Sequence, residues 1–480
     1  MRPRVSQHGT RPLLGHIPEL NEWLGCSAAA LPKFSALVPP KSEPADWRWH
    51  GHHRHRESVG QERANASSAR VKGSVREKKK KKKKRMAIAQ EQELVLITGA
   101  TGHVGSTTLA HLIRAGYNVR AVVRSEAKSA QLLARPSIQR AIKHSRRWSN
   151  RYRNQLTTTT STGQLSFVVV PDITAPGAYD DAVVGATLVV HIASPLVTAD
   201  TVPLSKHEEY FLRPAVRGTL GLLEAARAAG TVRRVVITSS IVSLVPVDRM
   251  EGNLSPEEAR SLPPVQPTDR VRDADGPYTS EFAAYHGSKV ASLAHAEEWV
   301  ARECPGFDVV YLHPSFVLGH NDAATTPAQA LKGTNAVVLA MLLGQRFGPY
   351  AGATVHVEDV ARAHVAALAV DRVPGNQSYI LSGPRPTTWN DAKEIVERRF
   401  PEAIKSRMLV TRGSVDTTYL PFDVSLTEET FGFEFTSFEE QVVSTVGQFI
   451  ELRMQQKAAL SRKNAAVRAR DALPSVRANA

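Results

Sequence analysis

Cysteine is nearly absent from this chain of 480 residues: the two cysteines, Cys26 and Cys304, lie far apart in the sequence. Such a pair predicts neither a disulfide framework nor a cysteine-based metal site, and it favours a reducing compartment, which we take to be the cytoplasm. Long apolar runs are also lacking, since no stretch of about 18 apolar residues occurs. We therefore expect no metal site and no membrane-spanning segment.

Acidic residues are scarce in only three segments of the chain. The formal net charge is +15, and residues 1–85 carry +13, residues 136–164 carry +6 and residues 453–480 carry +6. The remainder is therefore acidic, with a net charge of −10. Evenly spread basic charge would predict a nucleic-acid or membrane partner. Because the charge is confined to peripheral segments, we expect neither.

The three basic segments define the expected domain boundaries. Residues 1–89 mix Pro, Ser, Ala, Arg and His without helical or strand periodicity and include a lysine run at 78–84, which predicts a disordered N-terminal extension. A functional basic arm, an import signal or a transit peptide is the alternative to a non-functional extension ahead of Met86. Residues 136–164 are interpreted as a surface insertion, and residues 453–480 as a basic C-terminal tail.

From residue 93 onward, apolar strands alternate with helical stretches. Continuous Val/Ile/Leu runs without polar alternation indicate strands that are covered on both faces. Strand–helix–strand order then predicts an α/β protein with a doubly wound parallel sheet of the Rossmann type. The predicted strands are 93–98, 118–123, 167–170, 188–192, 235–238 and 309–312, and a helix is predicted over 103–115.

Two parts of the folded region are expected. Residues 90–315 form the dinucleotide-binding Rossmann domain. Residues 316–452 form mainly a smaller C-terminal substrate-binding subdomain, from which residues 353–383 return to the Rossmann core.

The first predicted strand runs into a glycine-rich turn, GATGHVG, at residues 99–105. Glycine is needed because the chain turns tightly and its backbone N–H groups must approach a pyrophosphate at a helix N-terminus. The motif is specific here because it follows a buried strand, opens a helix and comes first in a βαβ unit. The expected cofactor contacts in this turn are Gly99, Thr101, Gly102, His103, Val104 and Gly105.

The end of the second strand indicates the type of dinucleotide. NAD enzymes usually place a carboxylate there to bond the ribose 2′-hydroxyl. Here the strand ends in Arg124 and is followed by Lys128, and these two cations are suited to clamp a 2′-phosphate. Glu126, on the following turn, is the one complication. We predict that the cofactor is NADP(H).

A serine, a tyrosine and a lysine form the candidate catalytic set. The fifth strand ends in Ser239 and Ser240, and Tyr285 and Lys289 stand at positions i and i+4 of a predicted helix. A nearby ammonium favours phenolate over phenol, so we expect Lys289 to lower the pKa of Tyr285 and allow it to exchange a proton. A serine hydroxyl at the end of a strand can bond a substrate oxygen.

These motifs together resemble the extended short-chain dehydrogenases/reductases of the NAD-dependent epimerase/dehydratase superfamily. The likeness covers residues 90–452 and is strongest to the branch of dihydroflavonol reductases, cinnamoyl-CoA reductases and fungal aldehyde and ketone reductases. Residues 354–368 and 422–435 match later segments of this branch. The principal matching segments are GATGHVG (99–105), VVHIASP (189–195), VVITSS (235–240), YHGSK (285–289) and LHPSFVLG (312–319).

The resemblance implies a role for each site residue. Tyr285 would donate a proton, Lys289 would lower its pKa and bond the nicotinamide ribose, and Ser240 would hold the carbonyl oxygen, with Ser239 as the fallback. The implied cofactor contacts are Arg124 and Lys128 at the 2′-phosphate, Asp172 and Ile173 at the adenine, Ala193, Ser194 and Pro195 beside the cofactor, and Pro314 and Val317 near the nicotinamide.

We therefore expect an NADPH-dependent ketoreductase or aldehyde reductase, a monomer or homodimer, acting on a small-molecule carbonyl. The sequence FAAYH at 282–286 replaces the NWYCY-like motif of cinnamoyl-CoA reductases, which disfavours a CoA thioester. Phe316, Phe347 and Tyr350 in the expected pocket segments favour an aromatic or polyketide-like compound of secondary metabolism.

Two other functions stay open. The first is an NAD-retaining epimerase or dehydratase. Dehydratases of that kind have an acidic pair directly after their serine, whereas Ile241 and Val242 follow the serine in this chain. A cofactor-sensing regulator on the same fold would be non-catalytic, and such proteins generally lack the pair formed here by Tyr285 and Lys289.

Overall fold

The computed structural model describes residues 93–146, 164–195, 202–250, 252, 255–272 and 276–471. The N-terminal segment that we expected to be disordered lies outside these residues, as does the second half of the expected insertion. No helix in the described part of the chain is both long and apolar enough to cross a bilayer.

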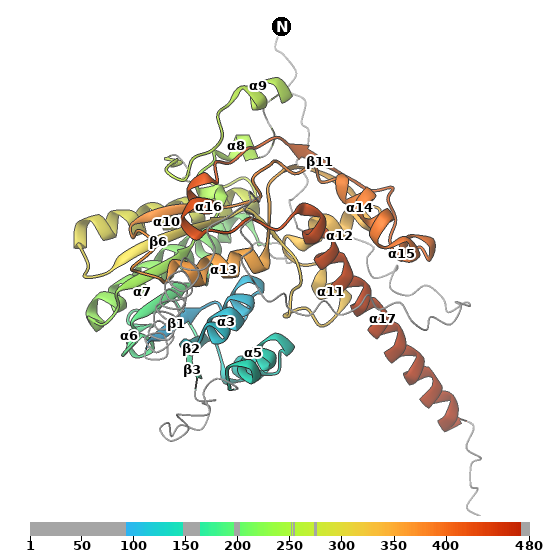
Figure 1. Ribbon diagram of the computed structural model, residues 1–480, viewed down its shortest axis with the longest axis horizontal. Coiled ribbons are helices and arrows are strands. Elements are labelled where there is room, and N and C mark those ends of the chain that lie inside the picture. Colours follow the sequence, from blue (N-terminus) through green and yellow to red (C-terminus); the bar gives the residue numbers. More distant parts are fainter. Residues whose placement is uncertain are drawn as a thin grey trace, which may run out of the picture. The chain divides into compact units, whose positions relative to one another are not determined.

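A seven-stranded parallel sheet forms the centre of the fold (Figure 1). The strand order is β10-β6-β5-β4-β1-β2-β3, so the chain winds outward from β1 to β3 and then crosses back to β4 on the other side of β1. The carboxyl ends of β1 and β4 therefore flank a topological switch point, where open α/β sheets bind their ligands. The strands are β1 (Leu94–Thr98), β2 (Asn118–Val123), β3 (Leu165–Val169), β4 (Leu188–His191), β5 (Arg234–Thr238), β6 (Asp308–Pro314) and β10 (Gln377–Leu381).

Helices cover both faces of this sheet. Successive side chains of a strand point to opposite faces. In β1, Val95 and Ile97 accordingly join one apolar cluster with Leu109, whereas Leu96 joins another with Leu222. The first face carries α3 (His103–Ala115), α5 (Pro136–Arg146) and α13 (Val357–Ala367), and the second carries α7 (Arg213–Ala229) and α10 (Glu281–Glu303), as Figure 1 shows. Burial on both faces explains why the strands are predominantly apolar, and the Rossmann fold predicted from the sequence is confirmed.

A third apolar cluster lies in the C-terminal part of the chain. It contains the fully buried Trp389 and is built around α12 (Asn335–Leu342), α14 (Asp391–Arg399) and α17 (Phe438–Asp471). Two parallel strand pairs belong to this region, β8 (Arg346–Ala351) with β11 (Ser414–Thr418), and β7 (Phe316–Leu318) with β9 (Thr354–His356). The remaining short elements are α4 (Glu126–Leu133), α6 (Asp180–Val183), η1 (Leu204–Lys206), η2 (Glu208–Leu212), η3 (Ile241–Ser243), α8 (Val247–Met250), α9 (Pro256–Ser261), α11 (Pro327–Ala330), α15 (Pro401–Lys405) and α16 (Ser425–Phe431).

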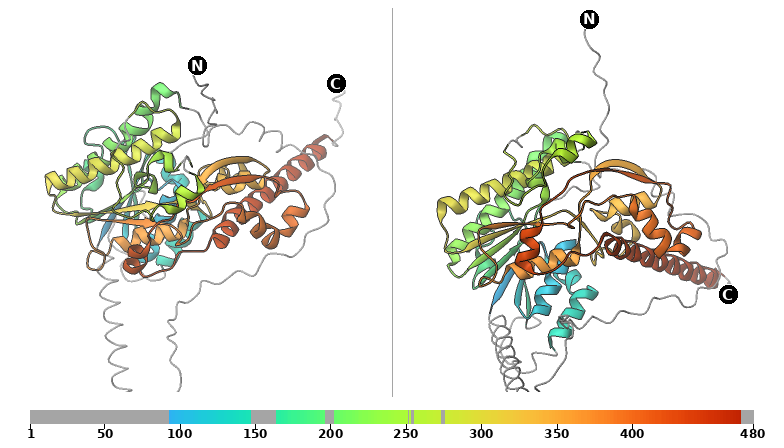
Figure 2. Two further views of the ribbon diagram at one scale, coloured as in Figure 1. Left: turned by 90° about the horizontal axis from the view of Figure 1, so that it is seen from above. Right: turned by 45° about the horizontal axis from the view of Figure 1, so that its top comes forward.

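Two segments differ from the sequence-based expectation. The expected surface insertion at 136–164 begins with α5, whose Ile138 and Ala141 are fully buried against the core, so its first third does not lie on the surface. Apolar residues at positions i, i+3 and i+4 form a stripe on this helix, although basic residues dominate its composition. The segment expected to be a basic tail continues α17 as far as Asp471 (Figure 2), because its Gln, Lys, Ala and Leu residues are strong helix formers.

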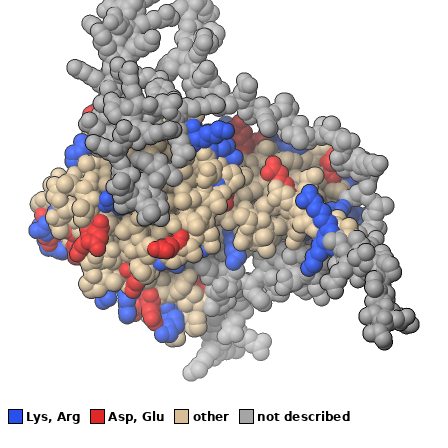
Figure 3. All heavy atoms as spheres, turned by 90° about the horizontal axis from the view of Figure 1, so that it is seen from below, with Lys and Arg blue, Asp and Glu red and all other residues tan. Residues whose placement is uncertain are grey.

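Charged side chains of both signs are interspersed on the face of the molecule seen in Figure 3. Lysine and arginine do not gather there into one continuous patch among the described residues.

Candidate active site

The glycine-rich turn follows β1 at the switch point. Gly99 has a φ of +70°, and a Cβ there would lie 2.7 Å from the backbone nitrogen of Ala193. A Cβ on Gly105 would lie 2.1 Å from the Gly99 carbonyl oxygen, so α3 packs directly on the turn. A Cβ on Gly102, the N-cap of α3, would meet only that oxygen, at 3.4 Å. The turn is therefore closed on its inner side and open at the helix N-terminus, which fits a dinucleotide pyrophosphate.

Thr98 joins β1 to the segment that follows β4. Its hydroxyl accepts from the backbone N–H groups of Ile192 and Ala193, each at 3.1 Å, and shares a hydrogen bond with Nδ1 of His191 at 2.9 Å. Burial and the positive charge of Lys289 lower the pKa of His191 to about 3, so the imidazole is neutral and bridges the two strands. The wall formed by residues 193–195 is thus fixed directly beside the glycine turn.

Ser240, Tyr285 and Lys289 come together at the carboxyl end of β5. Ser240 caps η3 by accepting from the backbone N–H of Val242 at 3.4 Å. Tyr285 and Lys289 lie one turn apart in α10, and Nζ of Lys289 donates to the carbonyl oxygen of Thr238 at 3.3 Å. A side-chain hydrogen bond links Tyr285 to Ser240. Both α10 residues therefore contact the end of the same strand.

Burial dominates the electrostatics of these groups. It lowers the pKa of the Lys289 ammonium to about 8. It also raises the pKa of the Tyr285 phenol, and the hydrogen bond from Ser240 only partly opposes that shift. The expected lowering of the Tyr285 pKa by Lys289 is therefore not what the structure shows. The reason is that desolvation of the ring outweighs the hydrogen bond, while the lysine points to the Thr238 carbonyl.

The two cations expected at the 2′-phosphate lie at the end of β2. Arg124 directly follows the strand and is exposed, and Lys128 is exposed on α4, where its Nζ donates to Oε1 of Gln131 at 3.0 Å. Glu126 opens α4 between them. Both side chains are exposed and therefore accessible to an anion.

The other expected cofactor residues lie along the same side of the sheet. Asp172 accepts from the backbone N–H of Thr174 at 2.8 Å and from its hydroxyl at 2.7 Å, which lowers the pKa of the carboxyl group. Ile173 packs against α7, since a Cβ on Gly218 would lie 3.0 Å from its Cδ1. Pro314 ends β6, and Val317 lies buried in β7.

Sequence reasoning missed one side chain that touches the glycine turn. Arg135, between α4 and α5, donates from Nη2 to the carbonyl oxygen of Thr101 at 2.6 Å, and its buried Nη1 has no hydrogen-bond partner among the residues that the structure describes. Arg135 belongs to no recognisable sequence motif. The only signal in the sequence is that it is a basic residue shortly after the predicted second strand.

The C-terminal helix also reaches this turn through a loop. Residues after β7 are held by α17: the backbone N–H of His320 donates to Ser444 at 3.0 Å, and that of Asn321 donates to Gln448 at 2.8 Å. The carbonyl oxygen of His320 in turn accepts from Nε2 of His103, at 3.1 Å, in the first turn of α3. Burial lowers the pKa of His103 to about 4, so this bond is made by a neutral ring.

A small cavity of about 10 Å³ joins the wall at Ala193 and Ser194 to Lys289 and Thr238. Among the described residues, no group of three or more His, Cys, Asp or Glu side chains is arranged to hold a metal ion. The fold and the site together define a Rossmann protein that presents a serine, a tyrosine and a lysine beside a dinucleotide crevice.

The chain belongs to the NAD-dependent epimerase/dehydratase family, which residues 95–381 match. Ketoreductase CTB6 of Cercospora nicotianae is 39% identical over 369 residues, which cover 75% of this chain and 95% of that protein. The NAD-dependent epimerase/dehydratase ALT6 of Alternaria alternata is 33% identical, covering 73% of this chain and 96% of the relative. The resemblance drawn from the sequence motifs is confirmed.

A solved structure shares the fold. Yeast methylglyoxal/isovaleraldehyde reductase Gre2, complexed with NADPH, matches with a TM-score of 0.58 at 22% identity, covering 75% of this chain and 98% of that one.

Proposed function

We propose that this protein is an NADPH-dependent reductase that transfers hydride to the carbonyl carbon of a small molecule. The observation that carries the proposal is the convergence of Ser240, Tyr285 and Lys289 at the end of β5, beside the crevice of the glycine turn. The names of the relatives support it, since CTB6 and the 29% identical protein sphI of Aspergillus fumigatus are both ketoreductases.

Each side chain has a distinct task in this reaction. The bound nicotinamide would supply the hydride that reduces the carbonyl carbon. Ser240 donates its hydroxyl proton as a hydrogen bond to the substrate oxygen and fixes its position. Tyr285 transfers its phenolic proton to that oxygen as negative charge develops there. The raised pKa of Tyr285 suits this direction of reaction, because the group is a phenol at neutral pH and has a proton to give.

Lys289 supports the proton transfer. A buried ammonium stabilises the phenolate that Tyr285 becomes after it has donated its proton. Lys289 lines the same small cavity as Ala193 and Ser194, so a ribose hydroxyl placed along that wall would lie beside the ammonium. The phenolate then recovers a proton from solvent, which completes the cycle.

The cofactor preference rests on the end of β2. No carboxylate ends this strand to accept from a ribose 2′-hydroxyl, and Arg124 and Lys128 offer two exposed cations to a 2′-phosphate. Glu126 lies in the first turn of α4, where its negative charge stabilises the N-terminus of that helix. It does not stand at the end of β2, where a carboxylate would accept from the ribose 2′-hydroxyl. We therefore propose NADPH over NADH.

The substrate is proposed to be an aromatic or polyketide-like carbonyl compound of secondary metabolism. The aromatic residues expected around the pocket are less available than the sequence suggested. Phe316 packs on Tyr350 with ring centroids 5.8 Å apart and on Trp389 at 5.4 Å, and Tyr350 is buried. These rings mainly build the C-terminal core, and only the half-buried Phe316 and Phe347 retain exposed surface for a substrate.

The test is a Tyr285→Phe variant, assayed by NADPH oxidation against a panel of aldehydes, β-ketoesters and aromatic ketones. Turnover is expected to fall roughly 10²- to 10⁴-fold, which is the usual contribution of a placed general acid. NADPH binding, followed by fluorescence titration, should be nearly unchanged because the ring remains. Tyr419→Phe, at an exposed tyrosine, serves as the matched control.

Near-native turnover by Tyr285→Phe would refute the proposed chemistry. Wild-type protein that binds NADPH but reduces nothing on the panel would favour the cofactor-sensing regulator. Co-purification of tightly retained NAD, without NADPH-dependent turnover, would favour the epimerase or dehydratase.

A further inference from the structure

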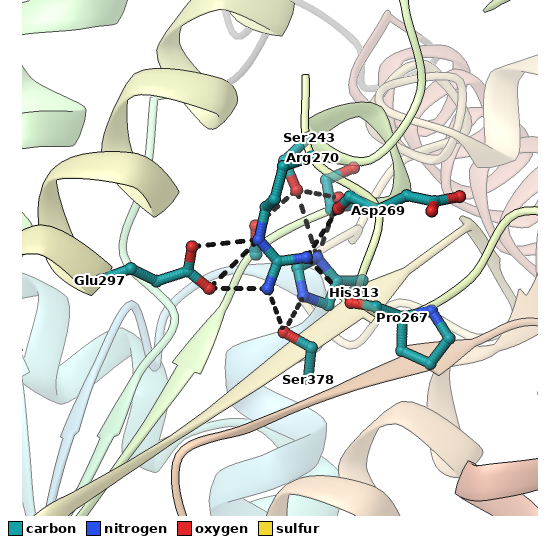
Figure 4. Close-up of polar contacts among 9 residues, drawn as sticks. Ser243, Pro267, Asp269, Arg270, Glu297, His313 and Ser378 are labelled. Atoms are coloured by element: carbon teal, nitrogen blue, oxygen red, sulfur yellow. Dashed lines mark hydrogen bonds and ion pairs between the residues drawn. The ribbon is translucent and has the colours of Figure 1, made fainter. Parts of the chain in front are cut away.

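A chain of polar side chains runs from the half-buried Arg270 through Ser378 to the buried His313 (Figure 4) and ends at the backbone carbonyl of Ser240. It begins at Arg270, whose guanidinium is held by the carboxylate of Glu297 on α10, with Nη2 at 2.6 Å and Nε at 3.0 Å. Nη1 of the same guanidinium donates to the carbonyl oxygens of Pro267, at 2.9 Å, and Asp269, at 2.6 Å. Four acceptors from two segments therefore fix the position of this cation.

The chain continues through β10 and β6. Nη2 of Arg270 donates to the hydroxyl oxygen of Ser378 at 3.0 Å, and Ser378 lies 3.2 Å from Nε2 of His313. Nδ1 of His313 lies 3.2 Å from the hydroxyl of Ser243 and 3.3 Å from the carbonyl oxygen of Ser240. His313 is fully buried, so no water competes for its nitrogens.

The partners of His313 determine where its proton sits. Burial and the charge of Arg270 lower its pKa to about 3, so the ring is neutral and carries one N–H. The Ser240 carbonyl can only accept, so its contact with Nδ1 is a hydrogen bond in the Nδ1–H tautomer and not in the other. Nε2 is then an acceptor and receives the proton of Ser378, whose oxygen accepts from Arg270. The directions of all these hydrogen bonds are mutually consistent with a single tautomer.

We propose that His313, as its Nδ1–H tautomer, is a positioning residue that holds the Ser240 carbonyl and thereby aligns the Ser240 hydroxyl with the substrate oxygen. The inference rests on the proposed reductase function. Arg270 and Ser378 act behind His313: a guanidinium can only donate, so it occupies one lone pair of the Ser378 oxygen and leaves the Ser378 proton to point toward Nε2.

The same directions separate the two neighbouring serines. The hydroxyl of Ser243 donates to the Ser240 carbonyl at 2.7 Å, so its oxygen can only accept from other groups. Ser239 lies 3.0 Å from that oxygen and must give its proton to it. Ser240 has no such commitment, since its oxygen accepts from Val242 and its proton is available to Tyr285 or a substrate. Ser240, and not Ser239, is the serine equipped to contact the carbonyl.

Three variants of His313 test the proposal through turnover. His313→Asn has an amide nitrogen bonded to Cγ, in the position of Nδ1, and so retains the donor to the Ser240 carbonyl. His313→Gln places its amide one atom further on, toward Ser378, and His313→Leu removes both polar atoms. We expect kcat to fall about 10²-fold in the Leu and Gln variants, as for a misplaced reacting group. The Asn variant should stay within about threefold of wild type.

The control measurements separate positioning from folding. The NADPH dissociation constant, from fluorescence titration, should be unchanged in all three variants, and the loss should appear in kcat rather than in KM for NADPH. His295→Leu, at an exposed histidine of α10, is the matched control. Equal losses in the Asn and Leu variants, or near-native kcat in the Leu variant, would overturn the proposal.

Nitrogen-15 NMR of histidine-labelled protein tests the tautomer directly, with the His313 signals assigned by their absence in His313→Asn. The expected spectrum has the proton on Nδ1 and a bare Nε2, and Ser378→Ala should weaken this preference. A proton on Nε2 would refute the positioning role. This measurement needs no turnover, so a protein that reduced no carbonyl would defeat the proposed function while the tautomer was still decided.

Discussion

Replacing Lys289 by methionine should stabilise the protein without cofactor while abolishing its turnover. The lysine side chain is 6% exposed, and burial lowers its pKa from 10.5 to about 8. Holding the charged form at pH 7 therefore costs about 3 kcal/mol relative to the unfolded chain. Methionine has a similar length and no charge, but it loses the hydrogen bond to Thr238, which contributes about 1 kcal/mol. The expected net gain is about 2 kcal/mol.

The gain depends on pH with a defined sign. Because the folded pKa lies below the unfolded one, the unfolded wild-type chain binds more protons between about pH 8 and pH 10.5. Wild-type stability from this group therefore rises with pH across that window, whereas the variant has no such term. The advantage of Lys289→Met should be complete below pH 8 and should disappear by pH 10.5.

Urea unfolding at pH 7 and at pH 10, followed by tryptophan fluorescence without cofactor, measures both effects. Lys457→Met, at an exposed lysine of α17, controls for the change of residue type. A Lys289→Met protein that was less stable than wild type at pH 7 would refute the reasoning. A difference of the same size at both pH values would refute it equally, because the buried charge would then not be its source.

Further outcomes are expected at other positions. Arg124→Asp combined with Lys128→Ala should raise KM for NADPH at least about tenfold and leave KM for NADH nearly unchanged, and equal losses in steady-state assays would defeat the assignment. Arg234→Met should lower the free energy of unfolding in urea by about 3–5 kcal/mol. The variant removes the fully buried guanidinium whose Nη2 lies 2.8 Å from Asp308, and it leaves that carboxylate without its ion-pair partner. Ile138→Ala should lower the free energy of unfolding by about 2–4 kcal/mol, because Ile138 is fully buried in α5. An unchanged urea midpoint would contradict the packing of α5 on the core.

The sequence located the sheet because its signals are local. Continuous Val/Ile/Leu runs marked six of the seven strands to within two residues of their observed ends, whereas β10 was not predicted as a strand. Gly99 and Gly105 are required by contacts within a few residues of the turn or with the adjacent strand end, and Tyr285 and Lys289 are neighbours on one helix. Strand ends were less certain because hydrogen bonding to the neighbouring strand, not residue type, decides where a strand stops.

What the sequence did not predict depends on distant segments or on burial. The link from Arg270 through Ser378 to His313 joins three segments that have no common pattern. The raised pKa of Tyr285 follows from desolvation, which only the folded protein reveals. Helix α5 was missed because its basic composition concealed a narrow apolar stripe.

The contact between the C-terminal helix and the glycine turn has a consequence for the order in which the protein assembles. The first turn of α3 bonds the carbonyl of His320, and that loop is held by Gln448, more than 300 residues further along the chain than His103. A nascent chain folds from its N-terminus, so the strands of the nucleotide crevice form long before this support exists. The strands beside the dinucleotide site therefore fold early, but the contact that supports its glycine turn forms only after the C-terminal helix has been synthesised. A chain that ends before Gln448 should lose cofactor affinity, although it contains every residue expected to contact the cofactor.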